Sequence, residues 1–343
     1  MTAPVRLEIS DSSGVAPVRR TLARLARELA FSEEDSGRAS LVATELATNL
    51  VRHATGGEIV MRADHDALEI IAWDRGPGMR DTAKSLVDGF STTGGSGTGL
   101  GAVHRIADTV EMNSTAPGGT VIVTTVRRHS DRRPALPADA DGRVQPAYTG
   151  QAAGLVLAVA PEVVSGDAWG AISSRNGDTV MLADGLGHGP GAAEASELAV
   201  ATLRSHEPVE ETLERAHDAL RPTRGAAVAV AQVDRQARVL HFAGVGNIAA
   251  EICGRASSRS LASMSGTAGR QVRTLRSFQY ELPESGFLIM HSDGCRSGWS
   301  VYSDPQLRRH SPLLIAATLI RDWERGRDDV SVVVLPLAAD EPG

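Results

Sequence analysis

Apolar residues recur at helical spacing over residues 15–30 and 35–54, so we predict a helix in each segment. A glycine-rich loop at 94–101 leads into a further short helix that ends near residue 107. Helices placed before and among closely spaced strands predict a two-layer α+β sandwich. The predicted strands cover residues 5–10, 57–64, 67–74, 108–114 and 119–127.

The pattern changes in the second half of the chain, where short apolar runs dominate. Many strands with few helices predict two packed antiparallel sheets flanked by helices. The predicted strands cover 155–160, 167–175, 178–184, 226–234, 237–244, 247–253, 272–282, 286–293 and 330–337. The predicted helices cover about 188–205, 208–220 and 312–324.

Residues 127–148 contain three prolines and mixed charge without any apolar period, which indicates a linker. No repeat relates the two sides, which carry different motifs. We therefore predict a first domain over 1–127, a linker over 128–149, a second domain over 150–338 and a tail over 339–343.

Composition indicates the class of protein and its cellular location. Of the 343 residues, 42% are hydrophobic and 22% charged, as in ordinary globular proteins, and the net charge of −7 disfavours a nucleic-acid or anionic-membrane partner. No apolar run reaches the ~18 residues that span a bilayer. The N-terminus lacks the apolar segment of a secretory signal. Cys253 and Cys295 form neither a disulfide framework nor a zinc spacing. We expect a cytoplasmic protein.

Four polar or glycine-rich signals occur in order along the first half. Glu45 and Asn49 are four residues apart and share one helix face. Asp74 ends an apolar strand and is followed by "RGPGM", whose glycines allow close approach to a ligand. The loop "GGSGTGLG" opens onto a helix N-terminus, which suits phosphates, and "PGGT" precedes the last strand. A surface helix or a turn would explain each signal alone.

Together these motifs resemble the GHKL ATPase group over about residues 5–127, and within it the small serine kinases of bacterial partner-switching systems. The resemblance implies a Bergerat-type ATP-binding fold. It implies that Asn49 holds Mg²⁺ on the phosphates of ATP and that Asp74 hydrogen-bonds the adenine amino group. Other implied ATP contacts are the adenine-pocket glycines Gly76 and Gly78, Thr120 near the base, and Gly97, Thr98, Gly99, Leu100 and Gly101 around the phosphates.

Glu45 is the candidate general base of the first half. A carboxylate near a substrate hydroxyl accepts its proton during phosphoryl transfer. His53 and His104 are expected to be structural rather than chemical.

Acidic residues recur at strand ends in the second half, in "SGDAW", "ADGLGHG", "HSDG" and "GRDDVSVVV". Any one could be a turn residue, but four such positions separated by core strands are harder to dismiss. Carboxylates gathered at one end of a sheet repel one another unless a cation lies between them. Oxygen ligands suit Mg²⁺ or Mn²⁺. The residues are Asp167, Asp184, Asp293, Asp328 and Asp329.

This order resembles the SpoIIE-type branch of the metal-dependent (PPM-type) serine/threonine phosphatases over about residues 150–337, and most of all its compact stressosome feedback phosphatase. The resemblance implies an αββα sandwich and two Mn²⁺ or Mg²⁺ ions. Asp184 would bridge the ions, and Gly185 would offer its carbonyl while leaving room for water. Asp167 and Asp293 would complete one ion's ligands and Asp328 the other's, with Asp329 as a ligand or an outer residue. A water between the ions would attack phosphorus in line.

His188 and Cys295 lie next to these motifs. His188 follows the "DGLG" turn and serves either as an acid or as a helix cap, and we favour a structural role. Cys295 lacks the phosphate-binding loop of cysteine phosphatases, so we expect it to be a small core residue.

These readings favour a bifunctional signalling enzyme, with an ATP-dependent serine/threonine kinase module and a phosphatase that acts on STAS-domain proteins or anti-sigma antagonists. A sigma factor is a further candidate partner, and a homodimer is plausible because kinases of this kind often pair. One alternative is a phosphatase regulated by a non-catalytic ATP- or partner-binding domain. Another is an anti-sigma sequestering protein.

Overall fold

A computed structural model describes residues 3–54, 56–64, 66–79, 99–129, 152–174, 177–205, 207–255, 257–272, 274–299, 301, 304 and 306–337. The chain divides into two compact units, Met1–Ala147 and Tyr148–Gly343, called here the first and the second unit. The division falls in segment 130–151. This segment contains most of the predicted linker and lies outside the described residues.

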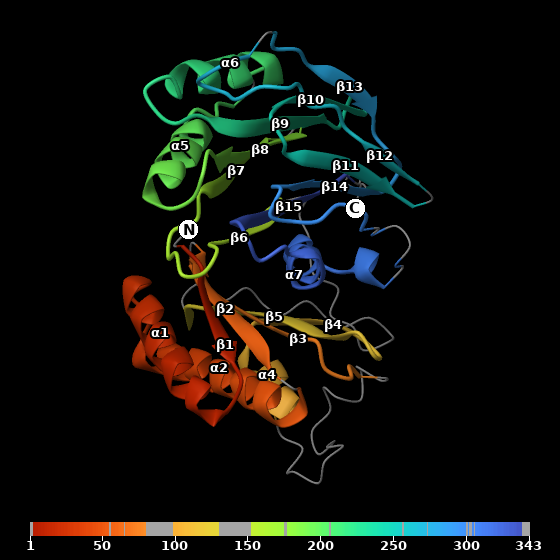
Figure 1. Ribbon diagram of the computed structural model, residues 1–343. Helices are drawn as coiled ribbons and strands as arrows, with labels where there is room; N and C mark the ends of the chain where they lie inside the picture. Colours follow the sequence, from red (N-terminus) through yellow and green to blue (C-terminus); the bar gives the residue numbers. More distant parts are fainter. Residues whose placement is uncertain are drawn as a thin grey trace. The chain divides into compact units, whose positions relative to one another are not determined.

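The first unit is a two-layer sandwich whose five-stranded antiparallel sheet has the order β1-β2-β3-β5-β4 (Figure 1). Three helices cover one face of the sheet and enclose a core of aliphatic residues. The strands are β1 (Val5–Ile9), β2 (Gly57–Asp64), β3 (Ala67–Asp74), β4 (Thr109–Thr115) and β5 (Gly119–Arg127). The helices are α1 (Val15–Glu28), α2 (Glu33–His53) and α4 (Gly99–Ile106), with a 3₁₀ turn at Ser12–Gly14.

Local sequence explains why α2, which carries the first candidate site, forms where it does. The Ser32 hydroxyl accepts a hydrogen bond from the backbone N–H of Asp35 at 3.0 Å, which caps the helix. Three acidic residues occupy the first turn and two basic residues the last, and both groups complement the helix dipole. Val42, Leu46 and Leu50 then form the buried stripe that faces the sheet.

The second unit is an αββα sandwich, as predicted. Its two five-stranded antiparallel sheets have the orders β13-β10-β9-β8-β7 and β12-β11-β14-β15-β6 (Figure 1). The strands are β6 (Ala153–Leu157), β7 (Asp167–Ser174), β8 (Gly177–Gly185), β9 (Ala226–Asp234), β10 (Val239–Val245), β11 (Ala249–Gly254), β12 (Ser258–Ser260), β13 (Phe278–Glu281), β14 (Gly286–His291) and β15 (Val330–Pro336). Helices α5 (Pro190–Ala201) and α6 (Val209–Ala219) pack on the first sheet, and α7 (Pro312–Trp323) packs on the second.

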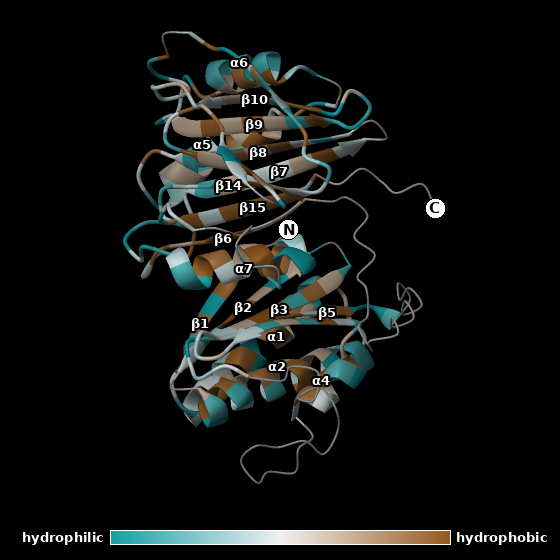
Figure 2. Ribbon diagram, turned by 90° about the vertical axis from the view of Figure 1, so that its right-hand side faces the viewer, coloured by the Kyte–Doolittle hydropathy of each residue, from teal (hydrophilic) through white to brown (hydrophobic). Residues whose placement is uncertain are grey.

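Alternating side chains on β8 separate two cores. Val180 and Leu182 belong to the cluster between the sheets, whereas Met181 and Ala183 belong to the cluster beneath α5 and α6. Figure 2 shows β9 and β15 largely in hydrophobic colours and α6 largely in hydrophilic ones, as expected for buried strands and a surface helix. By the same alternation, Asp184 lies on the side of β8 that faces the other sheet.

Two strands differ from the sequence prediction. The strand predicted at 272–282 is reduced to β13, because Val272 and Leu275 pack against the core beneath α5 and α6 instead of pairing in the sheet. The short edge strand β12 was not predicted, since "SRS" has no apolar member. The sandwich is otherwise assembled from the predicted elements, with shifts of a few residues at their ends.

Within the described ranges, no helix is long and apolar enough to cross a bilayer. Cys253 and Cys295 are both buried and unpaired. Burial raises the pKa of the Cys295 thiol to about 12, which leaves it protonated and a poor nucleophile. The prediction that Cys295 is a core residue is therefore confirmed.

Candidate active sites

Two aspartates face each other across neighbouring strands of the second unit. Asp167 begins β7 and Asp184 lies one residue from the end of β8, and the register places them directly opposite. Directly opposed residues of an antiparallel pair project on the same side of the sheet. Both therefore lie on the inner side, at one end of the sandwich. Asp167 is only 6% exposed.

The other sheet brings its acidic residues to the same end. Asp293 follows β14 and Asp328 precedes β15, and these two strands are antiparallel neighbours. The ladder extends beyond the strands, because Ser292 N–H donates to the Ser331 carbonyl at 3.1 Å and Ser331 N–H donates to the Ser292 hydroxyl at 3.0 Å. The five acidic residues predicted from sequence, called here the carboxylate cluster, thus come from both sheets.

Burial and neighbouring negative charges raise the pKa of two carboxyl groups in the cluster. The pKa of Asp184 is raised to about 8, first by burial and then by the charges of Asp167, Asp293, Asp328 and Asp329. The pKa of Asp167 is raised to about 7, mainly by burial, although the nearby hydroxyls of Ser292 and Ser331 oppose the shift. Two carboxyl groups that favour protonation near neutral pH make a site in which a cation would be stabilised.

The donor set fits divalent cations that prefer oxygen ligands. Asp167 Oδ2 is buried and has no partner with hydrogen-bond geometry among the described residues. Asp293 is exposed and accepts from the Asn247 side-chain amide at 2.7 Å. As the side chains stand, no three His, Cys, Asp or Glu residues of the described chain surround a single metal position. Binding would require rotamer changes, for which the exposed Asp293 and Asp328 have room.

Asp328 and Asp329 have different surroundings. Asp329 is 2% exposed, and its two carboxylate oxygens accept backbone N–H groups from Val159 at 2.7 Å and Gly166 at 2.5 Å. It thereby fixes both ends of the loop that leads into Asp167. Asp328 is exposed and accepts the N–H of Asp329 at 2.9 Å. This geometry favours Asp328 as the ligand and Asp329 as the residue that positions the loop.

Gly185 lacks a side chain for a reason that sequence analysis missed. We expected the missing side chain to leave room for water. Instead, a Cβ at this position would lie 2.1 Å from the carbonyl oxygen of Ala192 in α5, so only glycine allows the helix to pack this closely. The close contact holds α5 against the strand end that carries Asp184.

Two histidines lie close in sequence to cluster residues, His188 after Asp184 and His291 before Asp293. His188 Nδ1 lies 3.2 Å from Glu162 Oε1, and the His188 side chain is 63% exposed. Its proposed capping role is wrong, because Gly189 is the N-cap of α5 and no side chain caps that helix. His291 is buried, which lowers its pKa and keeps it neutral. Of these two histidines, His188 is therefore the one whose ring solvent can reach.

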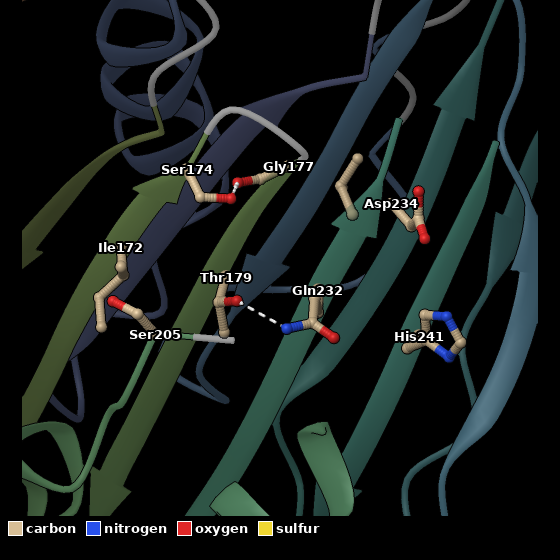
Figure 3. Close-up of a pocket in the computed structure, with 9 residues that line it drawn as sticks. Ile172, Ser174, Gly177, Thr179, Ser205, Gln232, Asp234 and His241 are labelled. Atoms are coloured by element: carbon tan, nitrogen blue, oxygen red, sulfur yellow. Dashed lines mark hydrogen bonds between the residues drawn. The ribbon is translucent and has the colours of Figure 1, made fainter. Parts of the chain in front are cut away.

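Two surface pockets lie in different parts of the second unit. One of about 270 Å³ is lined by Arg296, Glu324, Arg325 and Arg327, which follow Asp293 or precede Asp328 in sequence. The other, of about 110 Å³, includes Thr179, whose hydroxyl accepts a hydrogen bond from Gln232 at 3.2 Å (Figure 3). It lies where β8 begins and β9 ends, at the opposite end of these strands from Asp184, and so takes no part in the cluster.

The first unit brings Glu45 and Asn49 together at the start of α4. A Cβ on Gly99 would lie 3.3 Å from Glu45 Oε2 and 3.2 Å from Asn49 Oδ1, so both side chains converge on this glycine. The Asn49 Nδ2 atom is buried without a hydrogen-bond partner in the described chain. An unsatisfied buried amide beside a carboxylate fits a site that is completed by a ligand.

The Asp74 end of the sheet is a compact polar corner. Asp74 and Thr120 are directly paired in register and project toward the helix layer, as Ile70 and Ala72 do. Asp74 Oδ1 accepts the N–H of Gly76 at 2.7 Å. Sequence analysis overlooked Ser114, whose hydroxyl lies 2.9 Å from that of Thr120. Ser114 lies on β4, two strands from Asp74 on β3, and no sequence pattern links the two residues.

The predicted glycines of this corner and of the phosphate loop are placed as follows. Gly78 has φ +66°, and a Cβ there would lie 2.3 Å from the Thr115 carbonyl oxygen. Leu100 packs on the core and Gly101 is buried, both in the first turn of α4. Gly97 and Thr98 lie outside the described residues.

Comparisons with known proteins identify relatives of the first unit. A family described as the histidine kinase-like ATPase domain matches residues 10–125. The serine/threonine-protein kinase RsbT of Bacillus subtilis (strain 168) is 39% identical over 112 residues, which cover 32% of this chain and 84% of that protein. The first unit thus contains a histidine kinase-like ATPase domain. Through it the chain belongs to the family of the serine/threonine-protein kinase RsbT.

Solved structures are similar over a larger share of the chain. One comes from work on the bacterial stressosome as a modular system adapted to control secondary messenger signaling. It has a TM-score of 0.51 and 26% identity, and the match covers 54% of this chain and 98% of that one. RsbX in complex with magnesium has a TM-score of 0.47 and 21% identity, and the match covers 54% of this chain and 94% of its own.

Proposed function

We propose that this protein is a bifunctional enzyme of a bacterial partner-switching system. The second unit removes phosphate from serine or threonine of a STAS-domain protein, and the first unit uses ATP to phosphorylate such a partner. The observation that carries the phosphatase assignment is the convergence of the carboxylate cluster from both sheets, with Asp167 and Asp184 opposed in register. The relationship to RsbT supports the kinase assignment.

Asp167, Asp184, Asp293 and Asp328, with the carbonyl of Gly185, would hold two Mg²⁺ or Mn²⁺ ions. Such ions lower the pKa of a water and neutralise charge on a phosphoryl group. Asp329 keeps the loop before Asp167 in place through its two backbone hydrogen bonds. The chain thus contributes by holding the metal-binding side chains in place. A well-ordered ligand set need not reorganise during the reaction.

His188 supplies the proton that the leaving serine oxygen needs. Its ring is exposed, and its contact with Glu162 holds it in the turn that follows Asp184. An imidazole ring that carries a proton can serve as a general acid toward the leaving oxygen.

In the first unit, Glu45 acts as the general base for the attacking hydroxyl and Asn49 as the Mg²⁺ contact on ATP. Their convergence on Gly99 supports the assignment, since the base and the metal contact must lie within reach of the same phosphate. Asp74, with Thr120 beside it, recognises the adenine amino group, and Gly76 and Gly78 form the floor of that pocket.

The test follows phosphate gain and loss separately. The full chain is incubated with radiolabelled ATP and purified STAS-domain proteins, and with the same proteins already phosphorylated on serine. We expect phosphate transfer that requires Glu45 and phosphate release that requires Mn²⁺ or Mg²⁺ and Asp184. ATP binding without any transfer would reduce the first unit to a regulator. Metal-independent phosphate release, or none, would refute the phosphatase.

A further inference from the structure

An arginine outside the predicted motifs lies against the glycine-rich turn that follows Asp184. Arg224 occupies the connection between α6 and β9 and is exposed. A Cβ on Gly191 would lie 2.9 Å from its guanidinium carbon, and one on Gly187 would lie 3.4 Å from Nη1. The missing side chains of Gly187 and Gly191 therefore create the space that the guanidinium fills.

The connection that carries Arg224 is fixed by hydrogen bonds to the turn after Asp184 and to Arg270. Leu186 N–H donates to the carbonyl of Gly225 at 3.0 Å, which ties the segment after Asp184 to the residue after Arg224. Arg270 donates to the carbonyl of Arg224 at 3.2 Å and to that of Thr223 at 2.5 Å. These hydrogen bonds order the backbone that carries Arg224, so binding would cost little backbone entropy there.

The guanidinium of Arg224 has no direct partner within the described ranges. Its guanidinium makes no hydrogen bond or ion pair with any described residue, although the turn that it covers begins α5. That helix has neither a capping side chain nor an acidic residue in its first turn. A cation placed at the positive end of a helix is electrostatically unfavourable unless an anion joins it. The guanidinium fork matches the oxygens of a phosphate group.

We propose that Arg224 binds the phosphoryl group of the substrate, a phosphate monoester dianion, beside the carboxylate cluster. This inference rests on the phosphatase function proposed above and names the residue that recognises the phosphate. Gly187 and Gly191 are needed to seat the guanidinium, which gives a physical role to two of the three glycines of "DGLGHGPG" that lie beyond Gly185.

The test uses the full chain and three substitutions: Arg224→Gln, Arg224→Lys and, as control, Arg221→Gln. Arg221 is exposed, lies three residues earlier on the same connection and pairs with Asp218 at 3.0 Å. With p-nitrophenyl phosphate and Mn²⁺, we expect Arg224→Gln to lower kcat/KM by about 10- to 100-fold, the worth of charge-assisted hydrogen bonds. Arg224→Lys keeps the charge but loses the fork, so its loss is smaller. Arg221→Gln stays within about twofold of wild type.

Calorimetric titration with inorganic phosphate and with Mn²⁺ supplies a readout that does not need turnover. We expect Arg224→Gln to weaken phosphate binding by a similar factor and to leave Mn²⁺ affinity and the unfolding temperature unchanged. Equal phosphate binding by wild type and Arg224→Gln, or no phosphate binding by wild type, would overturn the assignment. If wild type hydrolyses nothing, the phosphatase function fails, and the phosphate titration alone still decides the role of Arg224.

Discussion

The two units place their candidate catalytic groups in different ways. In the first unit, Glu45 and Asn49 are four residues apart on α2, so a single capped helix sets their spacing. In the second unit, Asp167 and Asp328 are separated by more than half of the domain and meet only because two sheets stack. The spacing of the first pair depends on one helix alone. The proximity of the second pair depends on the packing of the whole sandwich.

From this difference we predict that the largest loss of activity follows substitution of Asp184, the proposed bridge between the two ions. We expect Asp184→Asn to lower Mn²⁺-dependent phosphate release at least about 10³-fold, because several kcal/mol of transition-state stabilisation is lost. ATP binding by the first unit should not change. Steady-state hydrolysis of a phosphoserine protein measures the effect, and activity within tenfold of wild type would contradict it.

The second-largest effect concerns the candidate site on α2. Glu45→Ala should reduce phosphate transfer by about 100-fold or more, the usual worth of a positioned general base. The affinity for ATP should be retained, since Asn49 and the Asp74 corner are intact. Transfer of labelled phosphate and fluorescent-nucleotide binding are measured on the same preparation. Unchanged transfer would show that Glu45 is not the base.

A smaller effect is expected at the buried residue behind the cluster. Asp329→Asn turns one of the two acceptors that face Val159 and Gly166 into a donor. We expect about 1–3 kcal/mol of lost stability and a 10- to 100-fold loss of Mn²⁺ affinity. Denaturant unfolding and metal titration measure the two losses. Asp328→Asn serves as the contrast, because that residue is exposed and should weaken metal binding without lowering stability.

The smallest expected effect is a pH dependence of the metal-free protein. Because the pKa values of Asp167 and Asp184 are raised to about 7 and about 8, the folded chain holds more protons than the unfolded chain between about pH 4 and pH 8. Stability therefore falls as pH rises through this window. With EDTA, we expect unfolding of the second unit to shift down by about 2–4 °C or more between pH 5 and pH 8.5. Added Mn²⁺ should reverse the shift, and the opposite slope would contradict the coupling.

Sequence patterns were informative where a period or a cap decides the structure. The buried stripe of α2 and the apolar run of β9 follow directly from their residues. The patterns could not distinguish Asp328 from Asp329, because that distinction depends on which side chain reaches Val159 and Gly166 across the fold. They also gave the wrong reason for Gly185 and no sign of Arg224, since both are explained by helix α5 packing beside them. Contacts between elements are not encoded locally.

The central claim is that the carboxylate cluster holds two divalent ions, and anomalous diffraction from crystals grown with Mn²⁺ tests it most directly. The account predicts two Mn²⁺ peaks at the end of the sandwich, bridged by Asp184 and reached by Asp167, Asp293 and Asp328. Their separation should be about 3.5–4 Å. Crystals with saturating Mn²⁺ and no peak beside Asp184 would contradict it.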